Sequence, residues 1–108
     1  MAVEIDPGAG VYTVMVPFTV EPGRREVLVE AIRSFAEDVV RHQPGFVSST
    51  VHISQDGTQV INYAQWASRE EFDAFQTNHD AMSRQGVIPQ FQPSGQPYTI
   101  AFQATAAA

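Results

Sequence analysis

Cysteine and lysine are both absent from this 108-residue sequence, and each absence removes a class of chemistry. Without cysteine there are no disulfides, no thiolate nucleophile and no cysteine ligands for an iron–sulfur cluster. Without lysine there is no side-chain amine for Schiff-base catalysis. An enzyme with this sequence must therefore work without several of the usual reactive groups.

Motifs for nucleotides, metals and nucleophiles are missing as well. The sequence has no G-x-G-x-x-G or P-loop motif, and none of its serines lies in a G-x-S-x-G motif. Its three histidines are far apart, and no H-E-x-x-H spacing links them. We therefore expect neither a cofactor nor a bound metal.

Charge and hydropathy argue against two kinds of partner. The net charge is −6, from six arginines and twelve carboxylates, and the arginines are scattered along the chain. Phosphate backbones require clustered positive charge, so we expect no nucleic-acid partner. No apolar run approaches the roughly 20 residues that span a bilayer, and the acidic N-terminus does not resemble a signal peptide. We therefore expect no membrane partner and a cytoplasmic location.

Length and periodicity predict one small α+β domain over residues 1–108, with loose ends at 1–9 and 104–108. The predicted elements are a strand at 11–20, a helix at 23–43, strands at 46–54 and 58–66 joined by the Asp56–Gly57 turn, a helix capped by Ser68 and Glu71, a short helical piece at 79–85, and a last strand at 98–103. This order predicts a ferredoxin-like, split βαβ fold with helices on one face of an antiparallel sheet.

Two helices can cover only one face of such a sheet, yet the other face is also apolar. Val11, Met15, Ile61 and Tyr63 alternate onto that uncovered side. Because an exposed apolar face usually meets a partner, we predict a homodimer that packs sheet to sheet.

The segment INYAQW, residues 61–66, places an amide on the strand face that points toward the helices. Asn62 and Trp66 share that face, about 13 Å apart by strand rise, and their apolar neighbours Val60 and Ala64 are candidates to contact a substrate. The small Ala64 leaves space above the sheet, so both polar groups can point N–H donors into an apolar chamber. The alternatives are structural: Trp66 as a core residue, and Asn62 as the partner of a buried backbone group.

A resemblance to a known family is carried by residues 44–75, PGFVSSTVHISQDGTQVINYAQWASREEFDAF. The segment resembles the antibiotic biosynthesis monooxygenase family, most closely its cofactor-independent enzymes that oxidise anthrone-type aromatic polyketides to quinones. The resemblance implies a homodimer, with a cavity in each subunit for a small aromatic substrate and O₂. It also implies that Asn62 stabilises an enolate oxygen, and that Trp66 binds a carbonyl or peroxy oxygen and stacks on the rings.

Five further side chains are candidates for the site. His52 is a candidate base and His79 a candidate for base or substrate contact, because an imidazole titrates near neutrality. Arg84 could hold an anionic or phenolic oxygen, while Phe72 and Phe75 could form the walls of the cavity. The alternative for the two histidines and the arginine is the solvent-exposed surface, and for the phenylalanines it is core packing.

The segment from Ile88 to Pro97 is predicted to form a lid or rim over the cavity. It holds three prolines and Gly95, so it should be irregular. Lids of this kind commonly exclude water from an active site.

Two departures from the family pattern leave other functions open. Related anthrone oxidisers can carry a tyrosine where this chain has Phe72, and other relatives carry a first-strand amide where it has Val16. Proton transfer would then fall to His52, His79, a tyrosine such as Tyr12, or water. A non-catalytic dimeric ligand-binding module and a ferredoxin-like polyketide cyclase remain as alternatives, whereas a haem-degrading relative with His79 as ligand is disfavoured by the missing amide.

Overall fold

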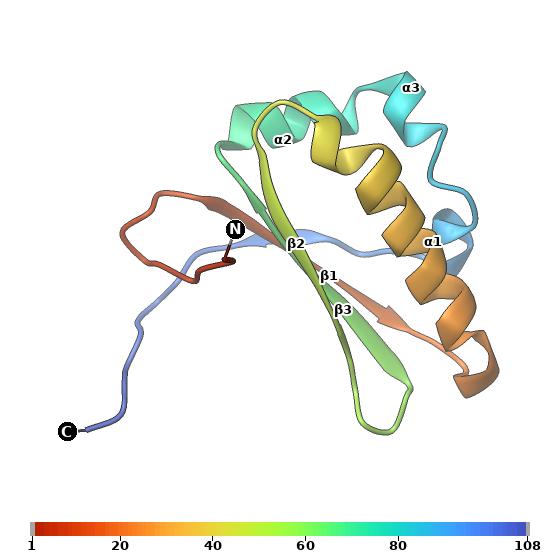
Figure 1. Cartoon of the computed structure of the whole chain (residues 1–108), viewed down its shortest axis with the longest axis horizontal. Helices are drawn as coiled ribbons and strands as arrows, with labels where there is room; N and C mark the ends of the chain where they lie inside the picture. The colour runs from red at the N-terminus through yellow and green to blue at the C-terminus, as the bar shows by residue number, and fades with distance from the viewer. Residues whose placement is uncertain (1, 108) are drawn as a thin grey trace.

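The computed structural model describes residues 2–107 and shows one sheet with the helices packed on one of its faces (Figure 1). The strands are β1 (Tyr12–Thr19), β2 (Phe46–Ile53), β3 (Gln59–Trp66) and β4 (Gln96–Tyr98). The helices are α1 (Arg25–Asp38), α2 (Arg69–Gln76) and α3 (His79–Met82), with short 3-10 helices η1 (Pro22–Arg24), η2 (Val40–His42) and η3 (Ile88–Phe91).

The strand order is β2-β3-β1-β4, and every neighbouring pair is antiparallel. Strands β1 and β3 form the centre and pair over their whole length, from Tyr12 opposite Trp66 to Thr19 opposite Gln59. The sequence-based prediction of a ferredoxin-like sheet with helices on one face is therefore confirmed.

The last strand differs from the prediction. It covers Gln96–Tyr98 instead of 98–103, and its final residue Tyr98 pairs with Thr13. Because β4 runs antiparallel to β1, the residues after Tyr98 pass beyond the point where β1 begins and have no strand beside them. They continue as an exposed extended segment, in which Phe102 is 83% exposed.

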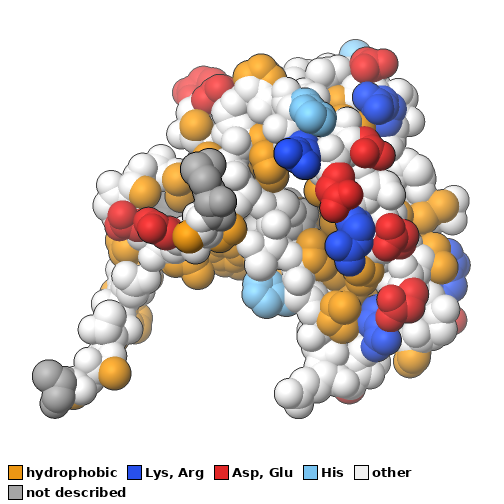
Figure 2. Space-filling model, viewed as in Figure 1, with side chains coloured by type: hydrophobic (Ala, Val, Ile, Leu, Met, Phe, Trp, Pro, Cys, Tyr) orange, Lys and Arg blue, Asp and Glu red, His pale blue; other side chains and the backbone are white. Residues whose placement is uncertain are grey.

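The core and the two ends of the central strands have different roles. At one end Phe18 and Val60 pair across β1 and β3 and pack against Leu28 and Ile32 on the inner face of α1. Burial of these apolar side chains is the main force that fixes α1 on the sheet. The outer face of α1 carries charged side chains of both signs (Figure 2). Arg33 and Glu30 form an ion pair there at 3.3 Å. Phe18 and Ile32 also border a cavity that extends from the core toward Trp66, at the other end of β3.

The face of the sheet away from the helices is partly covered by the N-terminal segment. The buried side chain of Gln65 donates to the backbone carbonyl of Glu4 at 2.8 Å and accepts from the Ser48 hydroxyl at 2.7 Å. Residues 2–9 and 104–107 are otherwise exposed and lie outside the helices and strands, while residues 1 and 108 lie outside the described residues. Ile61 on this face stays 37% exposed.

The hairpin turn between β2 and β3 is built around the Asp56 carboxylate. It accepts hydrogen bonds from the Ser54 hydroxyl at 2.7 Å, the Thr58 hydroxyl at 2.7 Å and the Thr58 backbone N–H at 3.0 Å. These bonds lower the pKa of Asp56 from 3.8 to about 2, and the bond from Ser54 has the largest effect. Each bond favours the charged form of the carboxyl group.

The lowered pKa of Asp56 predicts a pH dependence of the turn. Since the pKa is lower in the folded chain, this contribution to stability is complete above the unfolded pKa of 3.8 and is lost as the pH falls through about 2. An NMR titration of the carboxyl group should give a midpoint of about 2. A midpoint near 3.8, the ordinary pKa of this group, would contradict the hydrogen bonding, and Asp56→Asn should remove this part of the pH dependence.

Gly45 lies between η2 and β2 and has a left-handed backbone conformation, which is unfavourable for residues with a side chain. Its φ is +83°, and a Cβ placed there would collide with the side chain of Glu71. Glu71 is committed to the predicted capping box of α2, which is confirmed: its N–H donates to the Ser68 hydroxyl at 3.2 Å, and that hydroxyl donates back to the Glu71 carboxylate at 3.1 Å.

Gly45→Ala is therefore expected to destabilise the fold. The left-handed backbone alone should cost about 1–2 kcal/mol of unfolding free energy, and displacing Glu71 should add to it. A melting curve should show a fall of about 4–8 °C for each kcal/mol in a domain of this size. Gly23→Ala is the matched control, because a Cβ there meets no atom within 4 Å and the backbone is not left-handed. Equal melting temperatures for the two variants would contradict the prediction.

Candidate active site

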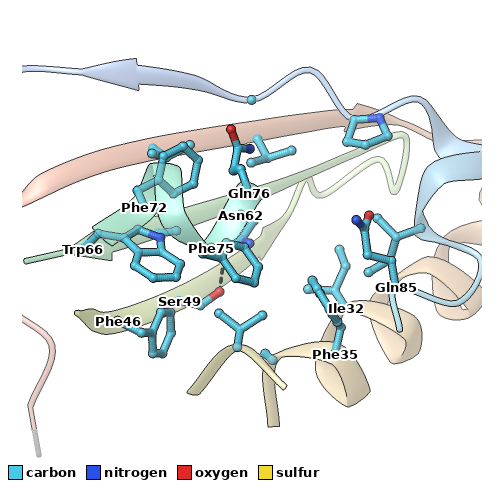
Figure 3. A pocket seen from close by; sticks show the side chains of 18 of the residues that line it. Ile32, Phe35, Phe46, Ser49, Asn62, Trp66, Phe72, Phe75, Gln76 and Gln85 are labelled. Carbon is cyan, nitrogen blue, oxygen red and sulfur yellow. Dashed lines mark hydrogen bonds between the residues drawn. The ribbon is translucent and has the colours of Figure 1, made fainter. Parts of the chain in front are cut away.

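A cavity of about 430 Å³ lies between the sheet and the helices and extends from Trp66 at the end of β3 to Phe18 and Ile32 at the edge of the core (Figure 3). This volume falls in the usual range for small-molecule sites, roughly 300–1,000 Å³. Most of its lining is apolar or aromatic, and it comes from β1, β2, β3, α1, α2 and the segment after α3. Within residues 2–107, the only charged side chains that line it are Arg69 and Asp73, which form an exposed ion pair at 3.5 Å on α2.

Asn62 lies in the wall of this cavity, half-buried on β3. Its Oδ1 accepts a hydrogen bond from the Ser49 hydroxyl at 2.6 Å (Figure 3). Among residues 2–107, the Nδ2 group has no hydrogen-bond acceptor. The amide therefore presents its donor end to the cavity and its acceptor end to the protein.

Trp66 closes one end of the cavity and is only 1% exposed. Its ring stacks on Phe75 at 5.0 Å and meets Phe46 and Phe72 edge-on at 5.4 and 5.6 Å. No fully buried side-chain nitrogen or oxygen lacks a hydrogen-bond partner in the part of the chain that the structure describes. Since the indole N–H has no protein partner there, it must open onto the cavity. The wall thus carries two N–H donors, from Asn62 and Trp66.

Ala64 forms the floor between these two donors. It shares their face of β3 and lines the cavity, with Val14 opposite it on β1. Its methyl group is small, so the space above it remains open.

Val60 does not line the cavity, which corrects the prediction for that residue. It shares the same strand face but is fully buried in the core, because α1 packs over that end of the sheet.

Phe72 and Phe75 combine the two roles that the sequence left open. Both line the cavity from α2, and both pack on the Trp66 ring. Phe75 also approaches Phe35 of α1 at 6.1 Å, so the same ring joins the two helices. The aromatic wall is therefore fixed by packing and is also exposed to whatever occupies the cavity.

The structure does not bring His52, His79 or Arg84 to the cavity. His52 pairs with Ile61 in the sheet and so lies on the face away from the helices, because successive strand residues alternate between faces. His79 is exposed at the start of α3, and Arg84 is exposed beside a separate hollow between α1 and the residues that follow α3. Their predicted placement at the site is therefore wrong, and the surface alternative describes all three.

Tyr12, in contrast, is placed where proton transfer could occur. It lies opposite Trp66 in the β1–β3 register and lines the cavity, with its ring 5.8 Å from that of Phe72.

The segment after α3 also reaches the cavity, through Ile88 and Gly95 among others. The prediction that this segment forms a rim is confirmed, and its movement as a lid remains a prediction.

The cavity lining also includes residues that were not singled out as site residues from the sequence, among them Phe35, Phe46, Ser49, Gln76 and Gln85 (Figure 3). Alternation along β2 could have indicated Ser49, and helical spacing could have indicated Phe35. The two glutamines follow the main motifs, one at the end of α2 and one after α3, and no pattern in the sequence points to them.

The described residues contain no cluster of three or more potential metal ligands. None of the helices within residues 2–107 is long and apolar enough to cross a membrane.

Comparison with known proteins agrees with this geometry. Tetracenomycin-F1 monooxygenase of Streptomyces glaucescens is 44% identical over 70 residues, which cover 65% of this chain and 62% of that protein. The match thus covers less than two thirds of that relative. A monooxygenase from the gene ActVA-Orf6 of Streptomyces coelicolor, in a crystal structure with the ligand Nanaomycin D, superposes with a TM-score of 0.77. It is 28% identical, over 94% of this chain and 96% of that one.

A third comparison concerns the fold. SnoaB, a cofactor-independent oxygenase from Streptomyces nogalater, superposes with a TM-score of 0.65 over 87% of this chain and 96% of its own, at 20% identity. Residues 11–84, which include β1 to α3, match the family described as antibiotic biosynthesis monooxygenase. The chain therefore belongs to the antibiotic biosynthesis monooxygenase family.

Proposed function

We propose that this protein is a cofactor-independent monooxygenase that oxidises an anthrone-type aromatic polyketide to a quinone with O₂. The observation that carries the proposal is a pair of N–H donors, from Asn62 and Trp66, that face an aromatic-walled cavity and have no acceptor in the described chain. Preorganised donors in a water-poor site stabilise oxygen anions strongly. The similarity to a tetracenomycin F1 monooxygenase supports the same substrate class.

The proposed reaction needs little from the protein beyond position and electrostatics. Loss of a proton from the anthrone methylene gives a carbanion that is delocalised onto the carbonyl oxygen. This electron-rich anion reacts with O₂ to form a carbon-bound peroxide anion, which takes back the proton to become a hydroperoxide. Loss of water from the hydroperoxide leaves the quinone carbonyl. One oxygen atom enters the product and the other leaves as water. Asn62 would stabilise the enolate oxygen, and Trp66 would hold the carbonyl or peroxy oxygen.

Shape supports an aromatic substrate. Phe46, Phe72 and Phe75 surround the Trp66 indole at one end of the cavity, and Val14 and Ala64 form a smooth apolar floor. Flat rings gain both burial and stacking in such a site. Of the candidates that the sequence offers for proton transfer, Tyr12 and a water molecule remain, because His52 and His79 lie outside the cavity.

Oxygen uptake is the decisive experiment. Dithranol, a dihydroxyanthrone, would be mixed with protein that has been verified free of metal and flavin, and O₂ consumption and quinone absorbance would be followed. We expect one O₂ consumed per quinone formed, faster than the spontaneous reaction. A non-catalytic binding module or a polyketide cyclase would bind dithranol without this acceleration, and that result would overturn the proposal.

We also propose that the protein is a homodimer formed through the sheet face that bears Ile61 and Tyr63. Ile61 remains partly exposed there, and the extended segment beyond Tyr98 leaves Ile100 and Phe102 without a strand beside them. Apolar side chains gather around the terminal segments of the molecule (Figure 2). An exposed apolar surface of this kind usually meets a partner.

Light scattering tests the dimer. The mass in solution at micromolar concentration should be twice the chain mass of 11.9 kDa. Ile61→Arg, which places a charge on the uncovered face, should shift the population toward monomer, while Val27→Arg on the exposed surface of α1 should not. A monomeric mass for the parent protein would contradict the prediction.

A further inference from the structure

Ser49 lies beside Asn62 in the cavity wall, and its hydroxyl is the hydrogen-bond partner of the amide. It comes from the neighbouring strand β2, where it pairs with Ala64, and it reaches diagonally to Asn62 Oδ1 at 2.6 Å (Figure 3). We propose that Ser49 is a positioning residue, which holds the Asn62 amide so that its N–H donor points at the enolate oxygen of a bound anthrone. This inference rests on the proposed function.

The orientation of the amide decides what Asn62 can do. The two ends of a carboxamide have nearly the same shape, but Nδ2 donates hydrogen bonds and Oδ1 accepts them. A half-turn of the amide would present the carbonyl oxygen to the cavity, where it would repel a developing oxyanion. With Oδ1 bound to the Ser49 hydroxyl, both Nδ2 hydrogens remain available on the cavity side. A donated hydrogen bond to the amide oxygen also polarises the amide and strengthens its N–H as a donor.

The opposite face of the sheet offers a direct comparison. There the adjacent residue of β2, Ser48, donates to Oε1 of Gln65, its direct partner on β3, at 2.7 Å, so a serine hydroxyl again binds an amide oxygen. In that pair the Nε2 end is also bound, to the carbonyl of Glu4 at 2.8 Å, so the protein uses both ends of the amide. In the Ser49–Asn62 pair, residues 2–107 bind only the acceptor end of the amide. The unused donor end is what distinguishes a site for a ligand from a structural bond.

The surroundings of Ser49 allow it to be changed without disrupting the core. Its side chain is half-buried and lines both the main cavity and an outer hollow between α1 and β2, which Val29 and Val51 also line. The outer hollow gives room for one added methyl group. Threonine at this position can therefore keep the hydroxyl, and it suits a strand.

Turnover of dithranol by four variants tests the inference. Ser49→Ala should lower kcat about tenfold, the value of one hydrogen bond, with little change in KM. Ser49→Thr should restore most of the rate. Ser48→Ala is the matched control: it breaks the equivalent bond on the opposite face, so it should lower the melting temperature and leave kcat unchanged. In an Asn62→Ala background, Ser49→Ala should cause no further loss, because the group that it positions is gone.

Two outcomes of this experiment would overturn the inference. One is an unchanged kcat for Ser49→Ala while the parent protein oxidises dithranol. The other is a full tenfold loss from Ser49→Ala in the Asn62→Ala background, which would show that Ser49 acts independently of the amide. Either outcome leaves the proposed oxygenase function standing.

Two further readouts do not depend on turnover. Without O₂, the absorbance of bound dithranol reports the pH at which it ionises, and Ser49→Ala should raise that pH by about one unit if a tenfold stabilisation of the anion is lost. In the ligand-free protein, NMR relaxation should show a more mobile Asn62 side-chain amide in Ser49→Ala than in Ser48→Ala. A parent protein that ionises dithranol but consumes no O₂ would refute the proposed function alone. Equal Asn62 amide mobility in the two serine variants would refute the positioning role alone.

Discussion

Asn62→Ala is expected to oxidise dithranol about 100- to 1000-fold more slowly than the parent protein, because loss of one preorganised oxyanion donor typically costs about 2.7–4 kcal/mol of transition-state stabilisation. The amide donor faces the cavity and has no acceptor in the described chain. Its effect should therefore be felt in the reaction and much less in the folded protein. Asn62→Asp should be at least as slow, because it replaces the donor with a negative charge beside an oxygen that must itself become negative.

The paired measurement of rate and melting temperature decides this prediction. Gln59→Ala is the matched control, since it removes an exposed amide from the same strand, outside the cavity. A stable Asn62→Ala protein that binds dithranol but barely oxidises it would support the catalytic role. A large fall in melting temperature with little change in turnover would show that the amide is structural.

The fold was largely predictable because its determinants are local. Alternation in β1 and β3, the Asp56–Gly57 turn and the Ser68 cap can all be recognised in short segments. The end of the last strand could not be predicted in this way. Whether residues after Tyr98 form a strand depends on the register of β4 against β1, and that register leaves them without a neighbour.

Only the part of the site that depends on alternation within one strand could be predicted from the sequence. Alternation was enough to place Asn62, Ala64 and Trp66 on one face. It could not show that α1 buries Val60 at one end of that face, because the contact joins distant segments. The Ser49–Asn62 bond likewise depends on the register between β2 and β3, which is shifted by an irregularity at the start of β2.

His52 was assigned to the site because of its side-chain chemistry, although its position in the hairpin excludes it. An imidazole is a good base at neutral pH, so it was assigned to the site. Its place in the hairpin already decided the matter: it pairs with Ile61, and neighbours across a strand pair share a face. Asn62 and Ile61 necessarily face opposite sides. Once the hairpin register is known, His52 is excluded from the cavity and Tyr12, opposite Trp66, is included.

Ala64→Leu is expected to lower kcat/KM for dithranol about 100-fold, the scale of effect that a misplacement of about 1 Å at a reacting centre can produce. Ala64 lies on the cavity floor between the donors of Asn62 and Trp66, where a larger side chain would lift a flat substrate away from both. The new atoms would project into a cavity of about 430 Å³, so the fold has room for them.

Stability should move in the opposite direction to activity in this variant. Each added methylene that fills apolar space removes surface from water, worth up to about 0.8 kcal/mol, so the melting temperature of Ala64→Leu should be unchanged or higher. Ala74→Leu, on the exposed side of α2 and outside the cavity lining, is the matched control and should leave turnover unaffected. Unchanged kcat/KM for Ala64→Leu would show that the substrate does not occupy the floor of the cavity. A loss of activity with intact stability would instead show that the open space above Ala64, left by the smallest apolar side chain on this face, is where the rings of the substrate lie.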